Sequence, residues 1–272
     1  MTGSSSASQY ALGSTDAEHE RLIRQSQWVN PHTERCFREA GISPGYRVLD
    51  IGSGVGDVAL LLARLVGRAG EVVGVERDTS SIRRARNRIA QAGLHNVTFA
   101  QCDISQIPTD EPFDAVVGRY ILIFLPDPVS VLHSLSLLVR AGGVVAFQEQ
   151  DWGSFVRHAR PFPLWSAAVS LIDETFRQSG ANLYLASRFR ELFHDAGLPM
   201  ASVRTDLLVG AEEWIPYLLQ SIHPQMRRCN LRIEELGDFD TLSQRLHAEV
   251  ATSNSKIPLP SLVSAWSRKS LK

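Results

Sequence analysis

Residues 47–63, RVLDIGSGVGDVALLLA, place three glycines at every second position between an apolar run and a helical pattern. The apolar run is typical of a buried strand, and the pattern after the glycines predicts a helix. In an open parallel sheet, such a turn lies at the carboxyl end of the first strand, where ligands bind. Because glycine permits a sharp turn and close approach of a ligand to the backbone, the stretch predicts a ligand-binding loop.

The spacing of the glycines separates this loop from two common nucleotide-binding motifs. A dinucleotide fingerprint, Gly-x-Gly-x-x-Gly, would place its third glycine at position 57, but that residue is Asp57 and the third glycine is Gly56. A phosphate-binding loop would require lysine followed by serine or threonine, and neither is present. Asp50, just before the loop, would repel a pyrophosphate and favours a ligand that carries a cation, such as an amino group or a sulfonium.

Two further acidic residues end the next two predicted strands. Glu76 can accept two hydrogen bonds from a ribose diol. Asp103 can accept a hydrogen bond from the exocyclic amine of adenine, with Ile104 or Arg77 beside the ring. Together the acids fit a neutral nucleoside with a cationic amino-acid tail. The alternatives are that Asp50 caps the following helix, that Glu76 is a solvated acid and that Asp103 forms a turn.

Predicted strands alternate with predicted helices along the first half of the chain. This order indicates an α/β fold with a parallel sheet and helices on both faces. The expected strands are 46–52, 70–77, 97–103, 113–122 and 144–151, and the expected helices are 56–67, 80–93 and 127–143.

The remaining segments are predicted to be mainly helical additions to this core. Residues 16–41 are expected to form two helices divided at Asn30-Pro31, because proline fits the first turn of a helix but not its interior. After the fifth strand we expect one amphipathic helix at 161–180 with polar surroundings within 153–186, a helix at 187–197, a strand at 201–210, mainly helical structure at 211–256 and a last strand at 261–269.

The composition is that of an ordinary globular protein, since 44% of the 272 residues are hydrophobic and 21% are charged. A net charge of −1 argues against a protein whose main task is to bind nucleic acid. No apolar run approaches the roughly 20 residues needed to cross a membrane, and the first residues lack the pattern of a signal peptide. We therefore expect neither a nucleic-acid nor a membrane partner.

The cysteines indicate the redox environment. Cys36, Cys102 and Cys229 are widely spaced and odd in number, so we expect no disulfide framework and a reducing cytoplasm. His32 and Cys36 are spaced to share a helix face. Two ligands without companions do not make a zinc site, so no metal is predicted.

The ordered motifs resemble those of class I S-adenosylmethionine-dependent methyltransferases over about residues 45–152. VLDIGSGVG matches the first motif, VVGVER the second, CDI the third, FDAVVGRYILIFLPDP the fourth and LVRAGGVVAFQE the region that leads into the fifth strand. Within this superfamily the chain is most similar to small-molecule enzymes with a ubiquinone/menaquinone-methyltransferase type of core. Ser53 stands where many relatives have cysteine.

The resemblance implies a Rossmann-like, doubly wound sheet of seven strands, in which the seventh runs antiparallel between the fifth and the sixth. It implies a flexible segment at 1–13, helices at 14–44, a core at 45–152 that binds S-adenosylmethionine, a helical cap at 153–186 and a remainder at 187–272 that completes the core around a helical insertion at 211–256. The residues expected to bind the cofactor are Tyr10, Gln25, Asp50, Gly52, Ser53, Gly54, Gly56, Glu76, Arg77, Asp103, Ile104, Gly118 and Arg119.

The turn after the fourth strand, GRYILIF, is expected beside the sulfonium by the same resemblance. Gly118 and Arg119 would lie near the methionine part of the cofactor, and Tyr120 near its methyl group. Alternatively, Arg119 is a structural residue that pairs with an acid near the amino terminus. Related enzymes fold an amino-terminal segment over the cofactor, so Tyr10 either closes the pocket or is merely the first ordered residue.

Methyl transfer needs a base only if the acceptor must lose a proton. Strand five ends at FQEQD, where alternation sends Glu149 and Asp151 to one side and Gln148 and Gln150 to the other. Glu149 is the first candidate base. Asp151 either lies in the acceptor pocket or caps the next segment, and His223 is either catalytic or structural. Side chains that can line the pocket, or else pack in the core, are Gln25, Gln27, Trp28, Phe155, Trp165, Tyr184, Trp214 and Tyr217.

These features predict a methyltransferase that acts on an O, N or C atom of a small aromatic or lipophilic metabolite, as in natural-product biosynthesis. One alternative is methylation of RNA or of a protein. The sequence GRYI, in place of an Asn-Pro-Pro-Tyr type of motif, argues against methylation of DNA and of glutamine. Another alternative is a non-catalytic protein that binds S-adenosylmethionine.

Overall fold

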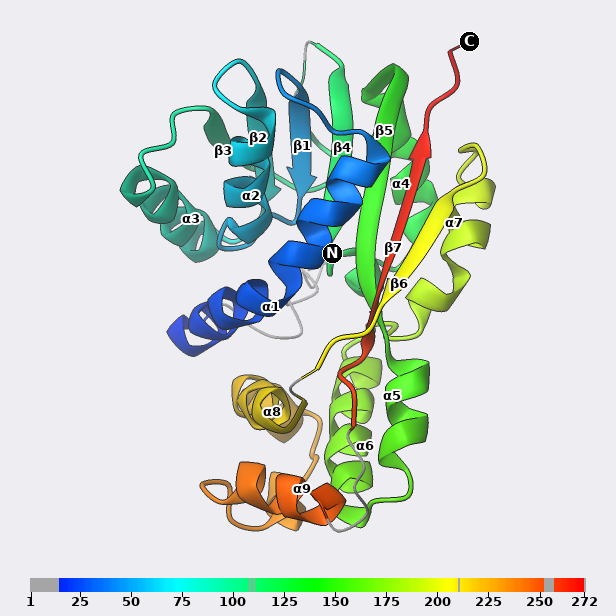
Figure 1. The fold of residues 1–272 in the computed structure, drawn as a ribbon. Coiled ribbons are helices and arrows are strands. Elements are labelled where there is room, and N and C mark those ends of the chain that lie inside the picture. The colour runs from blue at the N-terminus through cyan, green and yellow to red at the C-terminus, as the bar shows by residue number, and fades with distance from the viewer. Residues whose placement is uncertain (1–14, 108, 110, 210, 252–256, 272) are drawn as a thin grey trace, which may run out of the picture.

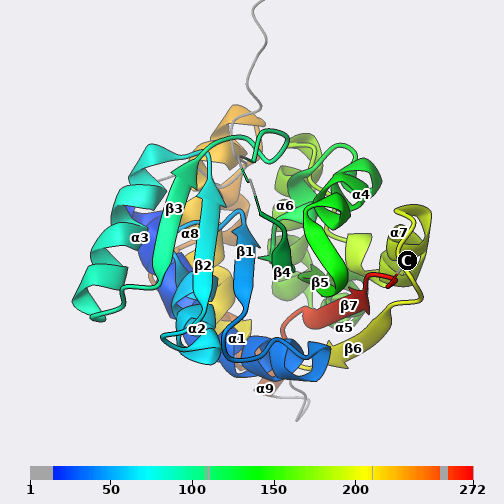
Figure 2. The same cartoon turned by 90° about the horizontal axis from the view of Figure 1, so that it is seen from above.

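The computed structural model describes residues 15–107, 109, 111–209, 211–251 and 257–271. In this part of the chain, seven strands form one sheet in the order β3-β2-β1-β4-β5-β7-β6 (Figure 1 and Figure 2). Neighbouring strands from β3 to β5 are parallel, whereas β7 is antiparallel to both β5 and β6. This confirms the expected Rossmann-like sheet and the position of its last strand. The strands are β1 (Arg47–Ile51), β2 (Glu71–Glu76), β3 (Val97–Gln101), β4 (Phe113–Arg119), β5 (Val139–Asp151), β6 (Ser202–Asp206) and β7 (Ser261–Arg268).

Helices cover both faces of the sheet (Figure 2). Val48 packs in the core beneath α1, α2 and α3, whereas its neighbour Leu49 packs in the core beneath α4 and α7. Successive side chains of a strand point to opposite faces, so β1 is apolar on both sides. The helices are α1 (Asp16–Ala40), α2 (Asp57–Val66), α3 (Thr79–Gln91), α4 (Pro128–Leu137), α5 (Trp152–Ala159), α6 (Pro163–Gln178), α7 (Phe189–Asp195), α8 (Ala211–Arg228) and α9 (Leu242–Ala251), with 3₁₀ turns at Leu122–Phe124, Leu185–Arg188 and Ile233–Leu236.

The expected division of the first helical segment at Asn30-Pro31 is wrong, because α1 continues through Pro31. Thr15 caps the start of α1, and Gly41 ends it in the left-handed conformation. Pro31 cannot donate to the carbonyl of Gln27, but both residues are exposed, so water can satisfy that carbonyl. The opposite face of α1 packs against α2 and the sheet, which holds the helix together across the proline.

Helices α5, α6, α8 and α9 form a helical group beyond the carboxyl ends of β4 and β5 (Figure 1). The helix expected at 161–180 is present as α6, which begins at Pro163, whereas the short helix α5 before it was not expected. Glu249 of α9 accepts hydrogen bonds from the backbone N–H groups of Leu164 and Trp165 at the start of α6 (2.8 and 3.0 Å). The carboxylate thereby caps α6 and ties the two helices together.

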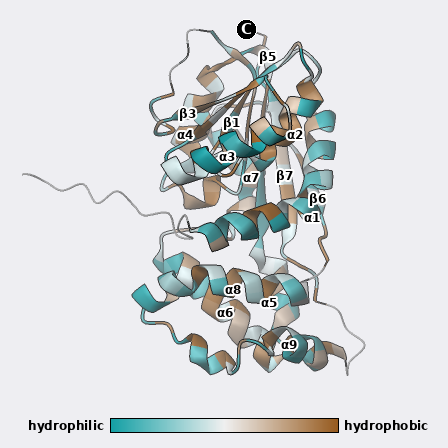
Figure 3. Ribbon diagram, turned by 90° about the vertical axis from the view of Figure 1, so that its left-hand side faces the viewer, coloured by the Kyte–Doolittle hydropathy of each residue, from teal (hydrophilic) through white to brown (hydrophobic). Residues whose placement is uncertain are grey.

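The helical group contacts the sheet through α1, which lies directly above α8 (Figure 3). The guanidinium of Arg24 in α1 lies 5.0 Å from the centre of the Tyr217 ring in α8. Within the ranges given above, no helix combines the length and apolar character needed to span a bilayer. The carboxyl ends of the parallel strands therefore face a junction between two packed layers, where a ligand site can form.

Candidate active site

The glycine loop joins β1 to α2 at the carboxyl end of β1. Gly52 and Gly54 have positive φ angles of 64° and 50°. A Cβ atom on Gly52 would come within 2.7 Å of the Ile121 side chain, so the site has no room for one. A Cβ atom on Gly54 would meet nothing closer than the Gly52 oxygen, at 3.9 Å. The backbone at Gly54 is thus open to a ligand, while Gly56 is the N-cap residue directly before α2.

Asp50 is buried in β1 beside this loop, with 1% of its surface exposed. Its Oδ2 atom has no hydrogen-bond partner among the described residues. Burial raises the pKa of Asp50 to about 8, although the Arg119 guanidinium acts in the opposite direction. A buried carboxylate is stabilised by a positive charge or a donor, so Asp50 fits the ammonium end of a ligand lying on the loop.

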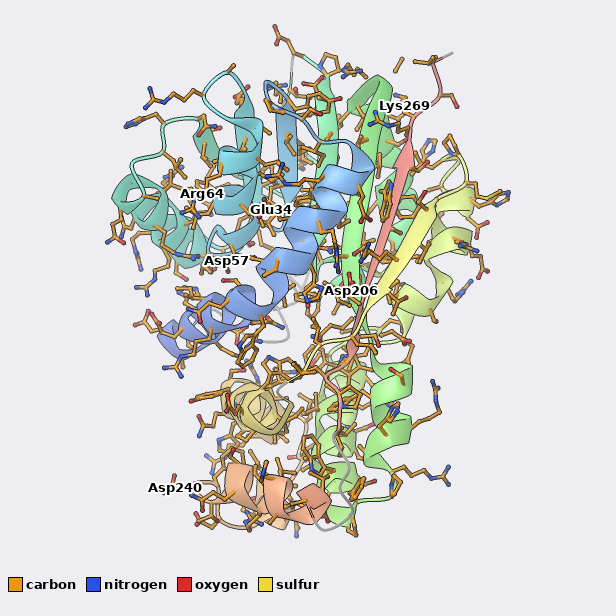
Figure 4. The ribbon with its side chains drawn as sticks, in the orientation of Figure 1. Glu34, Asp57, Arg64, Asp206, Asp240 and Lys269 are labelled. Carbon is orange, nitrogen blue, oxygen red and sulfur yellow. The ribbon has the colours of Figure 1, made fainter. Side chains whose placement is uncertain are left out.

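Asp57 occupies the position of the third glycine in a dinucleotide fingerprint and begins α2 (Figure 4). Its Oδ1 accepts a hydrogen bond from Nη2 of Arg88 at 2.7 Å, and Arg88 Nη1 also donates to the Val55 carbonyl. The charge of Asp57 is therefore paired within the protein. Asp50, by contrast, has a buried Oδ2 without a partner among the described residues.

Glu76, at the end of β2, holds the glycine loop against the next turn. Its Oε2 accepts a hydrogen bond from Gly54 N (3.1 Å), and its Oε1 accepts from the backbone N–H groups of Arg77 and Asp78 (2.8 and 3.0 Å). The Glu76 side chain is half-buried, so its carboxylate remains accessible to hydroxyl groups of a ligand. Ser53 is buried nearby, and its Oγ has no partner within the described ranges.

Asp103 follows β3 and forms a turn with Ser105. Its Oδ1 accepts hydrogen bonds from Ser105 N (2.9 Å) and Oγ (2.7 Å), and these bonds lower the pKa of Asp103. Asp103 and Arg77 are exposed, while Ile104 is half-buried. Asp103 therefore shapes the turn and still has lone pairs available for a ligand.

Arg119 ends β4 and fixes α1 against the carboxyl edge of the sheet. Its Nη1 donates hydrogen bonds to Asn30 Oδ1 (2.8 Å) and Thr33 Oγ1 (2.9 Å). These partners are neutral side chains of α1 rather than an acid near the amino terminus. Gly118, the preceding residue, is buried in the strand. Arg119 is near enough to Asp50 to lower its pKa, so the arginine both holds α1 and acts electrostatically on the glycine loop.

A cavity of about 400 Å³, including its open mouth, lies between the sheet and the helical group. Its walls come from α1, the turn after β4, the end of β5, and helices α5, α6 and α8. The ring of Trp152 lies 6.3 Å from that of Trp214 and 6.4 Å from that of Phe176, centre to centre. Aromatic walls with a few polar groups are typical of a small-molecule site. The lining residues are Arg21, Leu22, Gln25, Tyr120, Ile123, Phe124, Gln150, Trp152, Phe176, Leu183, Trp214 and Leu218.

Tyr120 connects the end of β4 with this cavity. Its φ angle is 57°, which is unusual for a residue other than glycine, and its N–H donates to the Gln148 carbonyl (2.9 Å). The side chain lines the cavity, and its buried Oη has no hydrogen-bond partner in the described part of the chain. Burial raises the pKa of Tyr120 well above its usual range, so the hydroxyl group stays protonated at neutral pH.

Glu149, the first candidate base, does not line this cavity. It is fully buried, and its Oε1 accepts hydrogen bonds from Ile121 N (2.9 Å) and Leu122 N (2.7 Å). Burial raises the pKa of Glu149 to about 8. Because alternate residues of a strand face opposite sides, Gln150 rather than Glu149 reaches the cavity. Glu149 instead holds the turn that carries Tyr120.

The other candidate pocket residues divide into cavity, core and surface positions. Trp214 and Gln25 line the cavity, while Phe155 and Trp165 are fully buried in the core. His223 in α8 does not line the cavity. Tyr184 and Tyr217 are 40% and 44% exposed, and Gln27 is also exposed. Trp28 is partly buried and packs against the core, and Asp151 caps α5. Tyr10 lies outside the described residues.

Arg21, Trp152 and Phe176 are among the cavity residues that were not expected from the sequence. The buried Arg21 donates to both carboxylate oxygens of Glu18 at 2.7 Å, and to Gln25 Oε1 at 3.2 Å. The place of Trp152 directly after the fifth strand is a sequence signal that could have identified it. Phe176 has no such signal, because tertiary packing of α6 brings it to the cavity.

The pair considered for a metal lies on the side of α1 that faces β6 and β7. Cys36 is fully buried, which raises the pKa of its thiol to about 12, and His32 lies 3.6 Å from Asp206 at the end of β6 (Figure 4). Arg35 and Arg204 also pair with Asp206. Among the residues whose positions are described, no three His, Cys, Asp or Glu side chains are grouped as metal ligands.

A family model for a methyltransferase domain matches residues 42–197, which is more than half of the chain. The chain belongs to this methyltransferase family. The matched region runs from before β1 to the end of α7 and therefore includes the glycine loop, the strand-end acids and the turn at Tyr120. It confirms the class that the ordered motifs predict.

Two curated methyltransferases are similar to part of this methyltransferase. The arsenite methyltransferase of Halobacterium salinarum is 33% identical over 125 residues, which are 46% of this chain and 30% of that protein. The ubiquinone/menaquinone biosynthesis C-methyltransferase UbiE of Cellvibrio japonicus is 32% identical over 106 residues, which are 38% of this chain and 43% of that protein. The chain thus spans less than half the length of these curated relatives.

A solved structure extends the similarity of fold to nearly the whole methyltransferase. The YcgJ protein from Bacillus subtilis is 17% identical, with a TM-score of 0.57, over 93% of this chain and 99% of that one. At this identity the likeness shows the fold alone. The helical group is therefore part of an arrangement that another protein of this fold shares.

Proposed function

We propose that this protein transfers a methyl group from S-adenosylmethionine to an O, N or C atom of a small apolar molecule. The observation that carries the proposal is the buried Asp50, whose unpartnered Oδ2 lies beside a glycine loop that is open at Gly54. A cationic amino-acid tail lying on this loop would supply the partner that Asp50 lacks. Membership in the methyltransferase family supports the same reading.

The residues around the loop fit the remainder of the cofactor. The half-buried carboxylate of Glu76 can accept hydrogen bonds from ribose hydroxyl groups, and the exposed Asp103 from the adenine amine. We assign Ile104 and Arg77 to flank the base. When bound, the cofactor would supply an electrophilic methyl group on a sulfonium, with a neutral thioether as the leaving group.

The residues of this chain contribute to the reaction mainly by positioning the acceptor. An in-line displacement is accelerated when the acceptor is held on one axis with the methyl group. Tyr120 stands between the end of β4 and the cavity, so we assign it to the wall against which the acceptor is held. Glu149 fixes this wall through Ile121 N and Leu122 N and acts as a positioning residue. His223 has no contact with the cavity that would give it a catalytic role.

The acceptor is proposed to be a small molecule rather than a nucleic acid. The net charge of −1 provides little attraction for a phosphate backbone, and aromatic side chains line the cavity. A reducing cytoplasmic location is supported by the free thiols of Cys36, Cys102 and Cys229.

Calorimetry with S-adenosylmethionine tests the proposal. Asp50→Asn keeps the shape of the side chain and removes its charge, so we expect cofactor affinity to fall at least about tenfold, since a hydrogen bond to a charged group contributes roughly 1.5–3 kcal/mol. The matched control is Asp240→Asn, which removes an exposed carboxylate at the far end of the helical group (Figure 4) and should leave affinity unchanged. Absence of saturable heat with the wild-type protein would exclude the proposed function.

A further inference from the structure

Two tryptophans that line the cavity have buried indole N–H donors without acceptors among the described residues. Trp152 and Trp214 are 1% and 4% exposed, both line the cavity, and neither Nε1 atom has a hydrogen-bond partner in the described part of the chain. An indole nitrogen can only donate, so rotation of the side chain does not remove its need for an acceptor.

Orphaned donors in a buried aromatic site are uncommon. A buried polar group without a partner costs roughly 1–3 kcal/mol, and most buried polar groups in native proteins are therefore paired. Trp165, in the same helical group, has its indole N–H paired, because its Nε1 donates to the Leu246 carbonyl at 2.9 Å. The difference between Trp165 and the two cavity tryptophans points to a ligand as the missing partner.

The charge of the cavity walls narrows the class of ligand. Arg21 brings a positive charge, but both of its bonds to the buried Glu18 are 2.7 Å long, so the pair is neutral as a unit. The side-chain oxygen of Gln25 accepts a hydrogen bond from Arg21, so its amide N–H groups remain available to donate to a ligand. The walls therefore favour a neutral oxygen over a carboxylate, and a cationic amine would place donors opposite donors.

We infer that the methyl acceptor is a planar, mainly apolar molecule with a neutral acceptor oxygen, such as an aromatic ketone, which Trp152 and Trp214 recognise through their indole N–H groups. The aromatic faces of Trp152, Trp214 and Phe176 pack around the ring system, and the oxygen accepts from the indoles. This inference rests on the proposed function, because it names the acceptor class for the same methyl transfer.

Four probes with one bicyclic skeleton test the inference on the full chain. Indane has no acceptor atom, 1-indanone carries a neutral carbonyl, indane-1-carboxylate is an anion and 1-aminoindane is a cation. We expect 1-indanone to bind at least about tenfold more tightly than indane, because satisfying an orphaned donor recovers roughly 1–3 kcal/mol. Equilibrium dialysis measures all four dissociation constants under one set of conditions.

Conservative variants identify the donors. Trp152→Phe and Trp214→Phe keep an aromatic ring and remove the N–H group, so each should reduce the preference for 1-indanone over indane about fivefold or more. Affinity for indane itself should change by less than about twofold, since the apolar wall is preserved. Trp165→Phe is the matched control, because its N–H bonds to Leu246 rather than to the cavity, and it should leave the preference unchanged.

Several outcomes overturn the inference: no preference for 1-indanone, no binding of any probe, tightest binding of the anion or the cation, or an equal loss of indane and 1-indanone in the phenylalanine variants. Unfolding of a variant does not decide the matter, because the wild-type ranking of the probes is an independent readout. The probe series needs no cofactor. A failure of S-adenosylmethionine binding is therefore distinguishable from a failure of the acceptor assignment.

Discussion

The two halves of the candidate site are built in different ways. The glycine-loop half consists of backbone and strand-end acids contributed by residues 50–119, largely in the order in which they occur along the chain. The cavity half consists of side chains that six elements bring together from positions between Arg21 and Leu218. The glycine-loop half depends on glycines that leave the backbone open, and the cavity half depends on the particular side chains that line it. The acceptor site can therefore diverge while the cofactor site keeps its form.

The sharpest way to break the glycine-loop half is to add atoms at Gly54. Gly54→Val places a branched side chain in the space open to the ligand, at a φ of 50° that valine rarely adopts. We expect S-adenosylmethionine affinity to fall by about 100-fold or more, which corresponds to roughly 2.7 kcal/mol. Gly93→Val is the matched control, because Gly93 has a φ of 64° and open space around it, far from the loop. Equal losses of cofactor affinity in both variants would show that backbone strain alone is responsible.

Removal of Glu149 tests the connection between the halves. Glu149→Ala leaves the N–H groups of Ile121 and Leu122 without an acceptor and opens a void, so the free energy of unfolding should fall by about 2–4 kcal/mol. Glu149→Gln keeps an acceptor oxygen and should cost about 1 kcal/mol or less. Denaturant titration measures both values. A Glu149→Gln variant with unchanged stability but no methyl transfer would restore the role of Glu149 as a base.

Truncation of an aromatic wall should affect the cavity half alone. Trp214→Ala removes a ring that packs against Trp152, so binding of indane should weaken about tenfold, in line with the 1 kcal/mol or more that an aromatic contact contributes. The affinity for S-adenosylmethionine should change by less than about twofold. A comparable loss of both ligands would mean that the two halves are one cooperative unit rather than two separable sites.

The difference between the halves also explains how much of the molecule could be predicted from its sequence. The glycine spacing and the acids Asp50 and Glu76 lie next to strand ends, so their positions follow from local order and from the rule that ligands bind at the carboxyl edge of a parallel sheet. The antiparallel last strand followed from the family resemblance. These features require no knowledge of distant contacts.

The cavity depends on contacts that sequence order does not reveal. Strand alternation separated Glu149 from Gln150 correctly, but only the tertiary structure shows that Gln150 is on the side of the cavity. Phe176 lies in a helix that the sequence predicted, but its place in the cavity depends on how α6 packs against distant parts of the chain. The uninterrupted α1 is a similar case, since the exposure of Pro31 and the packing of the opposite face override a local preference.

A further prediction concerns the pH dependence of stability. The pKa of Asp50 rises from 3.8 to about 8 and that of Glu149 from 4.5 to about 8 because both carboxyl groups are buried. Between these values the folded protein holds more protons than the unfolded chain, so the free energy of unfolding should fall as the pH rises from about 4.5 to about 8 and then level off. Asp50→Asn removes one titrating group and should flatten this slope, whereas Asp240→Asn should not.

Cofactor binding should show the opposite pH dependence. The ammonium group of S-adenosylmethionine pairs with ionised Asp50, so affinity should rise several-fold between about pH 6 and pH 8 as that carboxyl group ionises. Calorimetry of wild type and Asp50→Asn across this range separates the two effects. An affinity that is equally independent of pH in both proteins would remove Asp50 as the partner of the ammonium group. Binding of neutral indane should not vary with pH, since the pair of Arg21 and Glu18 leaves the cavity half without net charge.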